Sequence, residues 1–327
     1  MLKAQIRSVI IYLITAALLV LVIQRVGPDE LLATLMGGKP GFVLLSLISA
    51  QVIIFLNVFK WQILLRSRGY DISVFHLWKL CLVGVFFNNF LPTNVGGDVV
   101  RGYELGKQIQ NSPLALASVF VERFTGFVVL VGLNAVSFVA LTQYRVTENP
   151  MLAATLLFAV VGLAIAAWLV LDRRLLSIVV RRARWRLAVK YLTKFEKFQQ
   201  AIHEFRQDRS VLLRAILLSC VYYVGIYGYV YYSMLAFHED VWFLGVALVV
   251  PITNLVAFVP LTFNGIGLTE LAYVLLFPMI GVPAPAALSA IVLIRANTAI
   301  SSLIGGLLYS RMRADSAATA VSPVSLS

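Results

Sequence analysis

The chain has 327 residues, of which 60% are hydrophobic and only 13% are charged, and its formal net charge is +12. A soluble domain cannot bury so large an apolar fraction, so the composition excludes a soluble enzyme. Runs of about 20 apolar residues, the length that crosses roughly 30 Å of hydrocarbon, recur along the chain. The predicted fold class is therefore all-α, in a polytopic integral membrane protein.

The net positive charge is typical of cytoplasmic loops in membrane proteins, where Lys and Arg set the orientation, and we expect no nucleic-acid partner. The two cysteines, Cys81 and Cys220, lie in apolar segments without CxxC spacing, so neither a metal site nor a disulfide is predicted. No nucleotide-binding motif is present. We expect no cofactor and no catalytic centre.

Six plain apolar segments are predicted to cross the membrane, and two regions are apolar but interrupted by Pro, Gly and Asn. The plain spans are 8–24, 41–59, 124–143, 151–171, 211–236 and 286–309. The interrupted regions, 77–110 and 241–281, are predicted to be broken or re-entrant helices. The first span has no convincing cleavage site after it, so it is interpreted as a retained helix rather than a signal peptide.

Basic residues predict that both termini lie in the cytoplasm of a bacterial cell, with the protein in the inner membrane. They flank the first, second and last plain spans: Lys3, Arg7, Lys60, Arg66, Arg68, Arg311 and Arg313. We expect a first membrane repeat at 1–171, a basic connector at 172–210, a second repeat at 211–313 and a disordered tail at 314–327.

The connector between Asp172 and Arg209 has eleven Lys and Arg against four Asp and Glu, with aromatic residues at helical spacing. Two interpretations remain open for it. It is either an amphipathic helix on the anionic cytoplasmic leaflet or a solvated connector that obeys the positive-inside rule.

The two interrupted regions resemble each other. In each, an apolar segment ends at Pro, an Asn follows within four residues, and two glycines precede an acidic residue. The members are Pro92, Asn94, Gly96, Gly97 and Asp98 in the first region, and Pro260, Asn264, Gly265, Gly267 and Glu270 in the second. Such an internal similarity favours inverted repeats whose helix N-termini bind a phosphate or carboxylate. The alternative is two ordinary loops punctuated by Pro and Gly.

Ionisable residues inside membrane segments are costly, so each is a candidate functional residue. The candidates are Asp98, Arg101, Glu122, Arg123, Glu270 and Arg295. Arg295 has no acidic neighbour in its own segment, and Glu270 is its predicted partner. Glu122 and Arg123 are interpreted either as functional residues or as a snorkelling pair at the interface.

Three motifs in this order resemble the lysylphosphatidylglycerol synthase transmembrane-region family. They are Asn-x-Gly-Gly-Asp-x-x-Arg at 94–101, Glu122-Arg123-Phe124, and Asn-Gly-Ile-Gly-x-x-Glu at 264–270. The resemblance covers nearly the whole chain. It implies a flippase-like membrane domain in a stand-alone member without the aminoacyl-transferase domain.

The first hypothesis for function is a lipid transporter that moves a phospholipid or polyprenyl-linked glycolipid between leaflets. Its expected partners are membrane lipids, either anionic phospholipid or polyprenyl-linked lipid. The alternative is a non-transporting lipid-binding subunit of a membrane synthase or glycosyltransferase system. The predicted headgroup site consists of Asn94, Gly96, Gly97, Asp98, Arg101, Glu122, Arg123, Asn264, Gly265, Gly267, Glu270 and Arg295.

Overall fold

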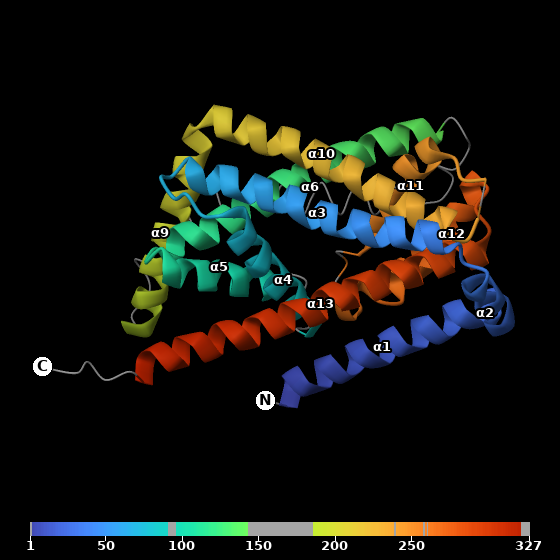
Figure 1. Ribbon diagram of the computed structural model, residues 1–327, viewed down its shortest axis with the longest axis horizontal. Coiled ribbons are helices and arrows are strands. Elements are labelled where there is room, and N and C mark those ends of the chain that lie inside the picture. The colour runs from blue at the N-terminus through green and yellow to red at the C-terminus, as the bar shows by residue number, and fades with distance from the viewer. Residues whose placement is uncertain are drawn as a thin grey trace, which may run out of the picture.

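Helices are the only regular elements in the residues that the computed structural model describes, which are 2–90, 96–142, 186–238, 240–257, 259 and 261–321 (Figure 1). In chain order the elements are α1 (Leu2–Val26), α2 (Pro28–Met36), α3 (Pro40–Arg66), α4 (Val74–Phe90), α5 (Gly96–Gln108), α6 (Ser112–Thr142), α9 (Arg186–Gln207), α10 (Arg209–Leu235), α11 (Phe243–Val256), the short 3-10 helix η2 (Phe263–Gly265), α12 (Leu268–Leu276), η3 (Phe277–Ile280) and α13 (Ala284–Val321). The predicted span at 151–171 lies outside the described residues.

Five helical stretches among the described residues are long and apolar enough to cross a membrane. A sixth is formed by α1 and α2 if the pair, which is bent by 79°, is counted as one span. The all-α, polytopic prediction is therefore confirmed.

Two predicted spans are too short at one end. The prediction ends one span before Lys60 and begins another after Arg123, because charged side chains normally mark the membrane boundary. In the structure α3 continues to Arg66 and α6 begins at Ser112. Both helices continue through these positions because Lys60, Glu122 and Arg123 pair with charges of opposite sign, and Lys60 and Glu122 are also buried.

Both interrupted regions are broken helices, as predicted. In the first, α4 packs against α5, and the 17 residues of α4 fall short of the roughly 20 that a full crossing needs. In the second, α11 packs against α12, and η2 lies between them in the chain. Each region thus places the N-terminus of a short helix inside the bundle.

The helices α3 to α6 recur in the same order as α10 to α13. Helices α10 and α11 begin 169 residues after α3 and α4, and α12 and α13 begin 172 residues after α5 and α6. Figure 1 shows α10 running in the opposite direction to α3, and α13 in the opposite direction to α6. This arrangement is that of an inverted repeat. The repeat boundaries stay a prediction, because 143–185 lies outside the described residues.

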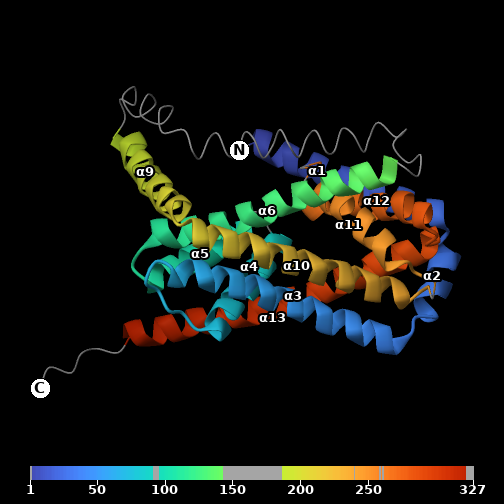
Figure 2. The same ribbon diagram turned by 90° about the horizontal axis from the view of Figure 1, so that it is seen from above.

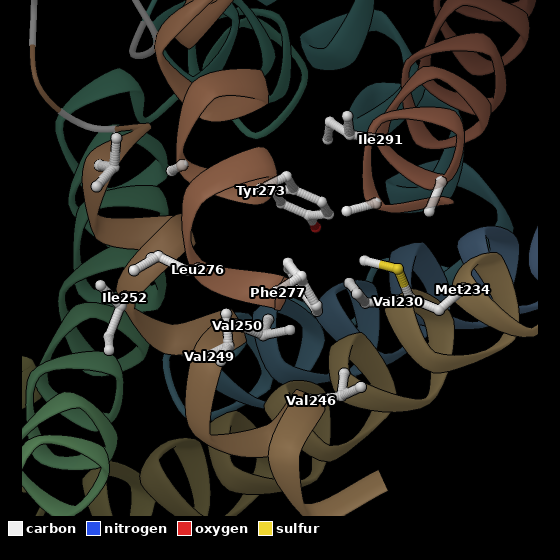
Figure 3. Close-up of a cluster of buried hydrophobic side chains, with 14 of the residues drawn as sticks. Val230, Met234, Val246, Val249, Val250, Ile252, Tyr273, Leu276, Phe277 and Ile291 are labelled. Atoms are coloured by element: carbon white, nitrogen blue, oxygen red, sulfur yellow. The ribbon is translucent and has the colours of Figure 1, made fainter. Parts of the chain in front are cut away.

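An apolar core fixes the second broken helix (Figure 3). Val230 of α10, Val249 of α11 and Ile291 of α13 belong to the same buried cluster as Phe277, whose side chain is fully buried. The ring of Tyr273 lies 4.7 Å from the ring of Phe277, centroid to centroid. Because lipid tails are as apolar as these side chains, close packing stabilises the contact in a bilayer. The core therefore holds α12 in a defined position.

Helix α9 crosses one end of the bundle, where α3, α5 and α13 end and α10 begins (Figures 1 and 2). Its residues Ile202 and Phe205 are buried against Leu64 of α3 and Val121 of α6. The apolar face of this part of the connector therefore packs on the protein. Neither interpretation from the sequence includes this packing, because it depends on tertiary contacts.

Candidate functional site

A buried network of charges joins three helices at the first broken region. Glu122 of α6 is 1% exposed, and its Oε1 accepts a hydrogen bond from the Nζ of Lys60 on α3 at 3.0 Å. Its Oε2 accepts one from the Nη2 of Arg101 on α5. The guanidinium of Arg101 also lies 4.7 Å from the ring centroid of Trp61. Because an unpaired buried charge costs several kcal/mol, this network fixes α3, α5 and α6 together.

Asp98 extends the network to Arg123. Its Oδ1 accepts hydrogen bonds from the Nε of Arg101 and the Nη2 of Arg123, both at 3.0 Å, and its Oδ2 accepts from the Nε of Arg123 at 2.9 Å. The side chain of Arg101 is 2% exposed, whereas that of Arg123 is 48% exposed. We call Lys60, Asp98, Arg101, Glu122 and Arg123 the first charge centre. It holds three cations against two carboxylates.

Glycine allows α5 to begin against the backbone of α4. A Cβ on Gly97 would lie 1.8 Å from the carbonyl oxygen of Gly84, so a larger residue does not fit. The amide of Gly97 donates to Oδ1 of Asn88 at 2.7 Å. Asp98 then falls in the first turn of α5, where the helix dipole favours a carboxylate. Gly96 is the first residue of α5.

Glu270 and Arg295 form the second charge centre. Glu270, 3% exposed, lies in the first turn of α12, and its Oε1 accepts a hydrogen bond from the Nε of Arg295 on α13 at 2.8 Å. Its Oε2 accepts from the backbone amide of Gly267 at 2.6 Å. The Nη1 of Arg295 donates to the carbonyl oxygen of Asn264 at 3.3 Å. The pairing predicted from the sequence is therefore present, and it has no net charge.

The two centres share one pattern. In each, an acidic residue in the first turn of a short helix pairs with an arginine 25 residues later, on the long helix that follows. Asp98 and Glu270 are 172 residues apart, as are Arg123 and Arg295, which is the offset between the helices that carry them. The pairs are equivalent positions of the repeat.

The two broken regions touch each other. The Nδ2 of Asn264 donates to Oδ1 of Asn89 at 2.8 Å. This contact requires a sharp turn of the second region, where Asn264, Gly265 and Gly267 have φ of 50°, 68° and 85°. Left-handed backbone of this kind suits Gly and Asn. The Asn and Gly residues of the second motif therefore shape the junction of the two halves.

Two adjoining chambers lie between the charge centres. The large chamber, about 300 Å³, reaches Arg295 and is lined mainly by α3, α10, α12 and α13. The small chamber, about 110 Å³, reaches Asp98, Arg101 and Arg123. Tyr222 of α10 lines both chambers, together with apolar residues of α3 and α4. Apolar pockets with a few convergent polar groups are the usual form of ligand sites.

The structure brings the predicted site residues together in two groups. The first contains Gly96, Gly97, Asp98, Arg101, Glu122 and Arg123, and the second contains Asn264, Gly265, Gly267, Glu270 and Arg295. Asn94 lies outside the described residues. The role of these residues as headgroup ligands stays a prediction.

One interpretation of the sequence is wrong. Glu122 is not half of a snorkelling pair at the interface: it lies ten residues inside α6, is buried, and pairs with Lys60 and Arg101. Sequence reasoning missed Lys60, which it assigned to a cytoplasmic loop, and also Asn89 and Tyr222. The apolar residues around Lys60 were the available signal for the lysine, since a lone charge within an apolar run needs a partner.

Comparison with known proteins identifies the family. Residues 6–306 match the family described as the lysylphosphatidylglycerol synthase TM region. A UPF0104 membrane protein from Methanothermobacter thermautotrophicus is 25% identical over 292 residues, covering 84% of this chain and 86% of the relative. Another, from Methanocaldococcus jannaschii, is 26% identical over 310 residues, covering 90% and 91%. A match over nearly the whole chain, with multi-pass helical architecture, shows that this protein belongs to the lysylphosphatidylglycerol synthase transmembrane-region family.

Proposed function

We propose that the protein binds a phospholipid or polyprenyl-linked lipid by its headgroup and moves the lipid between the two leaflets. One observation carries this proposal. Two adjoining chambers end at Arg123 and Arg295, which are equivalent residues of the two inverted halves. A site between broken helices of inverted repeats is the architecture of many secondary transporters, in which one half rocks against the other.

The charge of the site supports an anionic headgroup. The first charge centre has one cation in excess, and Arg123 is its exposed arginine. A net positive charge is costly at membrane depth, so the single negative charge of a phosphate would balance the centre. The planar guanidinium suits phosphate because it donates two parallel hydrogen bonds.

The basic end of the bundle supports an orientation. Arg66, Lys107 and Arg209 lie at the ends of α3, α5 and α10 that meet α9 (Figure 1). Following the positive-inside rule, we place this end at the cytoplasmic face of a bacterial inner membrane. Both termini are then cytoplasmic, because α13 ends at this face and α1 runs away from it (Figure 1).

Leaflet exchange in proteoliposomes tests the proposal. Dithionite quenches fluorescent lipid analogues in the outer leaflet only, so a transporter raises the fraction quenched above the half that protein-free vesicles show. We expect the wild-type chain to accelerate the exchange of the lipid analogues between leaflets. We expect roughly tenfold slower exchange in Arg123→Gln, because removing a charge-assisted hydrogen bond to phosphate costs about 1.5–3 kcal/mol. The matched control is Arg214→Gln on α10, an exposed arginine that lines neither chamber.

The outcomes distinguish the lipid transporter from the lipid-binding subunit, the two hypotheses that the sequence left open. No acceleration with phospholipid or polyprenyl-linked analogues, for folded protein inserted in the vesicles, would overturn transport. Retained binding of these lipids under the same conditions would then favour the lipid-binding accessory subunit. Equal rates in Arg123→Gln and Arg214→Gln would show that the site lies elsewhere.

A further inference from the structure

The described residues that line the large chamber include no carboxylate. Among the described residues that line it, Arg295 is the charged one. Its partner Glu270 is 3% exposed, and both carboxylate oxygens already accept hydrogen bonds, from Arg295 and from the amide of Gly267. In the small chamber, Asp98 is likewise bound by two arginines. A positively charged amine in either chamber would therefore meet cations without an available counter-charge, which is costly in a bilayer.

The two halves differ in chemistry at equivalent positions. The repeat offsets relate Lys60, Arg101 and Glu122 of the first half to Tyr229, Tyr273 and Ile294 of the second. All three residues of the second half line the large chamber. Buried charge in one half thus corresponds to hydroxyl and apolar groups in the other. The large chamber therefore suits an uncharged polar group.

Thr269 offers a free hydroxyl to such a group. Its side chain is 7% exposed and lines the large chamber, and its Oγ1 has no hydrogen-bond partner among the described residues. A buried hydroxyl without a partner is unfavourable. Apart from Arg295, the other polar side chains of the chamber also carry amides or hydroxyls: Tyr222, Tyr229, Asn254, Tyr273, Asn297, Thr298 and Ser301. A polyol matches such a lining, because each of its hydroxyls both donates and accepts.

The small chamber suits a phosphate. Arg123 binds Asp98 through Nε and Nη2, which leaves its Nη1 without a hydrogen bond to the described residues. One phosphodiester charge would neutralise the cation in excess at the first charge centre. Tyr222 lines both chambers, so a headgroup that passes it reaches from one chamber to the other.

Resting on the proposed function, we infer that the substrate is a phosphodiester lipid whose headgroup is an uncharged polyol or sugar. The phosphate lies against Arg123 in the small chamber. The polyol lies in the large chamber against Thr269. The substrate carries one negative charge, and lipids with an amine in the headgroup are excluded by charge.

Binding of defined lipids to the full chain in detergent, measured by native mass spectrometry, tests this inference. Phosphatidylglycerol and phosphatidylinositol carry a phosphodiester and a polyol, phosphatidylethanolamine replaces the polyol with an amine, and phosphatidic acid has no polyol. We expect the two polyol lipids to bind at least tenfold more tightly than phosphatidylethanolamine. Thr269→Val should weaken their binding roughly two- to tenfold, the loss of one neutral hydrogen bond, and leave phosphatidic acid unchanged.

Thr262→Val is the matched control. Thr262 is also 7% exposed with an unpartnered hydroxyl, but it lines neither chamber, so its substitution should change no lipid affinity. Both variants keep the shape of the side chain, so both should fold. Equal binding of phosphatidylethanolamine and phosphatidylglycerol, or equal effects of the two substitutions, would overturn the inference.

The failure of this inference can be distinguished from the failure of the transporter proposal. Leaflet exchange without headgroup preference would overturn this inference and leave the transporter proposal standing. Selective binding of polyol lipids without leaflet exchange would support this inference and overturn the transporter proposal.

Discussion

The two halves of the protein carry the same acid–arginine pair but satisfy it differently. In the first half, Asp98 and Arg123 belong to a network in which both carboxylates, those of Asp98 and Glu122, are paired with charged side chains. In the second half, the backbone amide of Gly267 and the backbone carbonyl of Asn264 complete the Glu270–Arg295 pair. Substituting one member of a pair of charged side chains leaves the opposite charge buried without its partner. A backbone partner is not removed by a side-chain substitution and still forms its hydrogen bond. The first half should therefore be more sensitive to substitution than the second.

The largest effect is expected for Glu122→Gln. The substitution leaves the buried cations Lys60 and Arg101 with Asp98 as the one carboxylate of the charge centre, so the free energy of unfolding should fall by about 3–5 kcal/mol. Unfolding in mixed detergent micelles measures this loss. The double variant Lys60→Met/Glu122→Gln restores the original excess of one cation and should recover most of the stability. A Glu122→Gln protein as stable as the wild type would contradict the buried network.

A smaller effect is expected for Glu270→Gln. The amide can still accept from Arg295 or from the Gly267 amide, so the loss should be about 1–3 kcal/mol in the same unfolding measurement. The comparison between halves would fail if Glu270→Gln were as destabilising as Glu122→Gln.

The smallest effect is expected at the junction of the halves. Asn89→Ala and Asn264→Gly each remove one hydrogen bond, which should cost about 1 kcal/mol. Asn264→Ala should cost about 1 kcal/mol more than Asn264→Gly, because Asn264 has a φ of 50° that alanine adopts with strain. A double-mutant cycle of Asn89→Ala and Asn264→Gly measures the contact itself. Strictly additive losses would show that the two side chains do not interact.

Much of the fold and half of the site could be predicted from the sequence. Arg295 lies in an apolar span without an acidic neighbour, so its need for Glu270 was visible. The pairing of Glu122 with Lys60 was missed, because Lys60 satisfies the positive-inside rule equally well in a loop or buried in α3. The repeat signal in the sequence was limited to the two broken regions. The helix offsets, and the exchange of charges for tyrosines, became visible only once helix bounds were known.

The position of a bound lipid tests the central claim most directly. The chain would be reconstituted in nanodiscs with phosphatidylglycerol as the anionic lipid, and its structure determined by electron cryo-microscopy. We predict phosphate density within hydrogen-bonding distance of Arg123 and glycerol density beside Thr269 in the large chamber. Acyl chains in both chambers, with the phosphate held at the membrane surface, would contradict a headgroup site between the two halves.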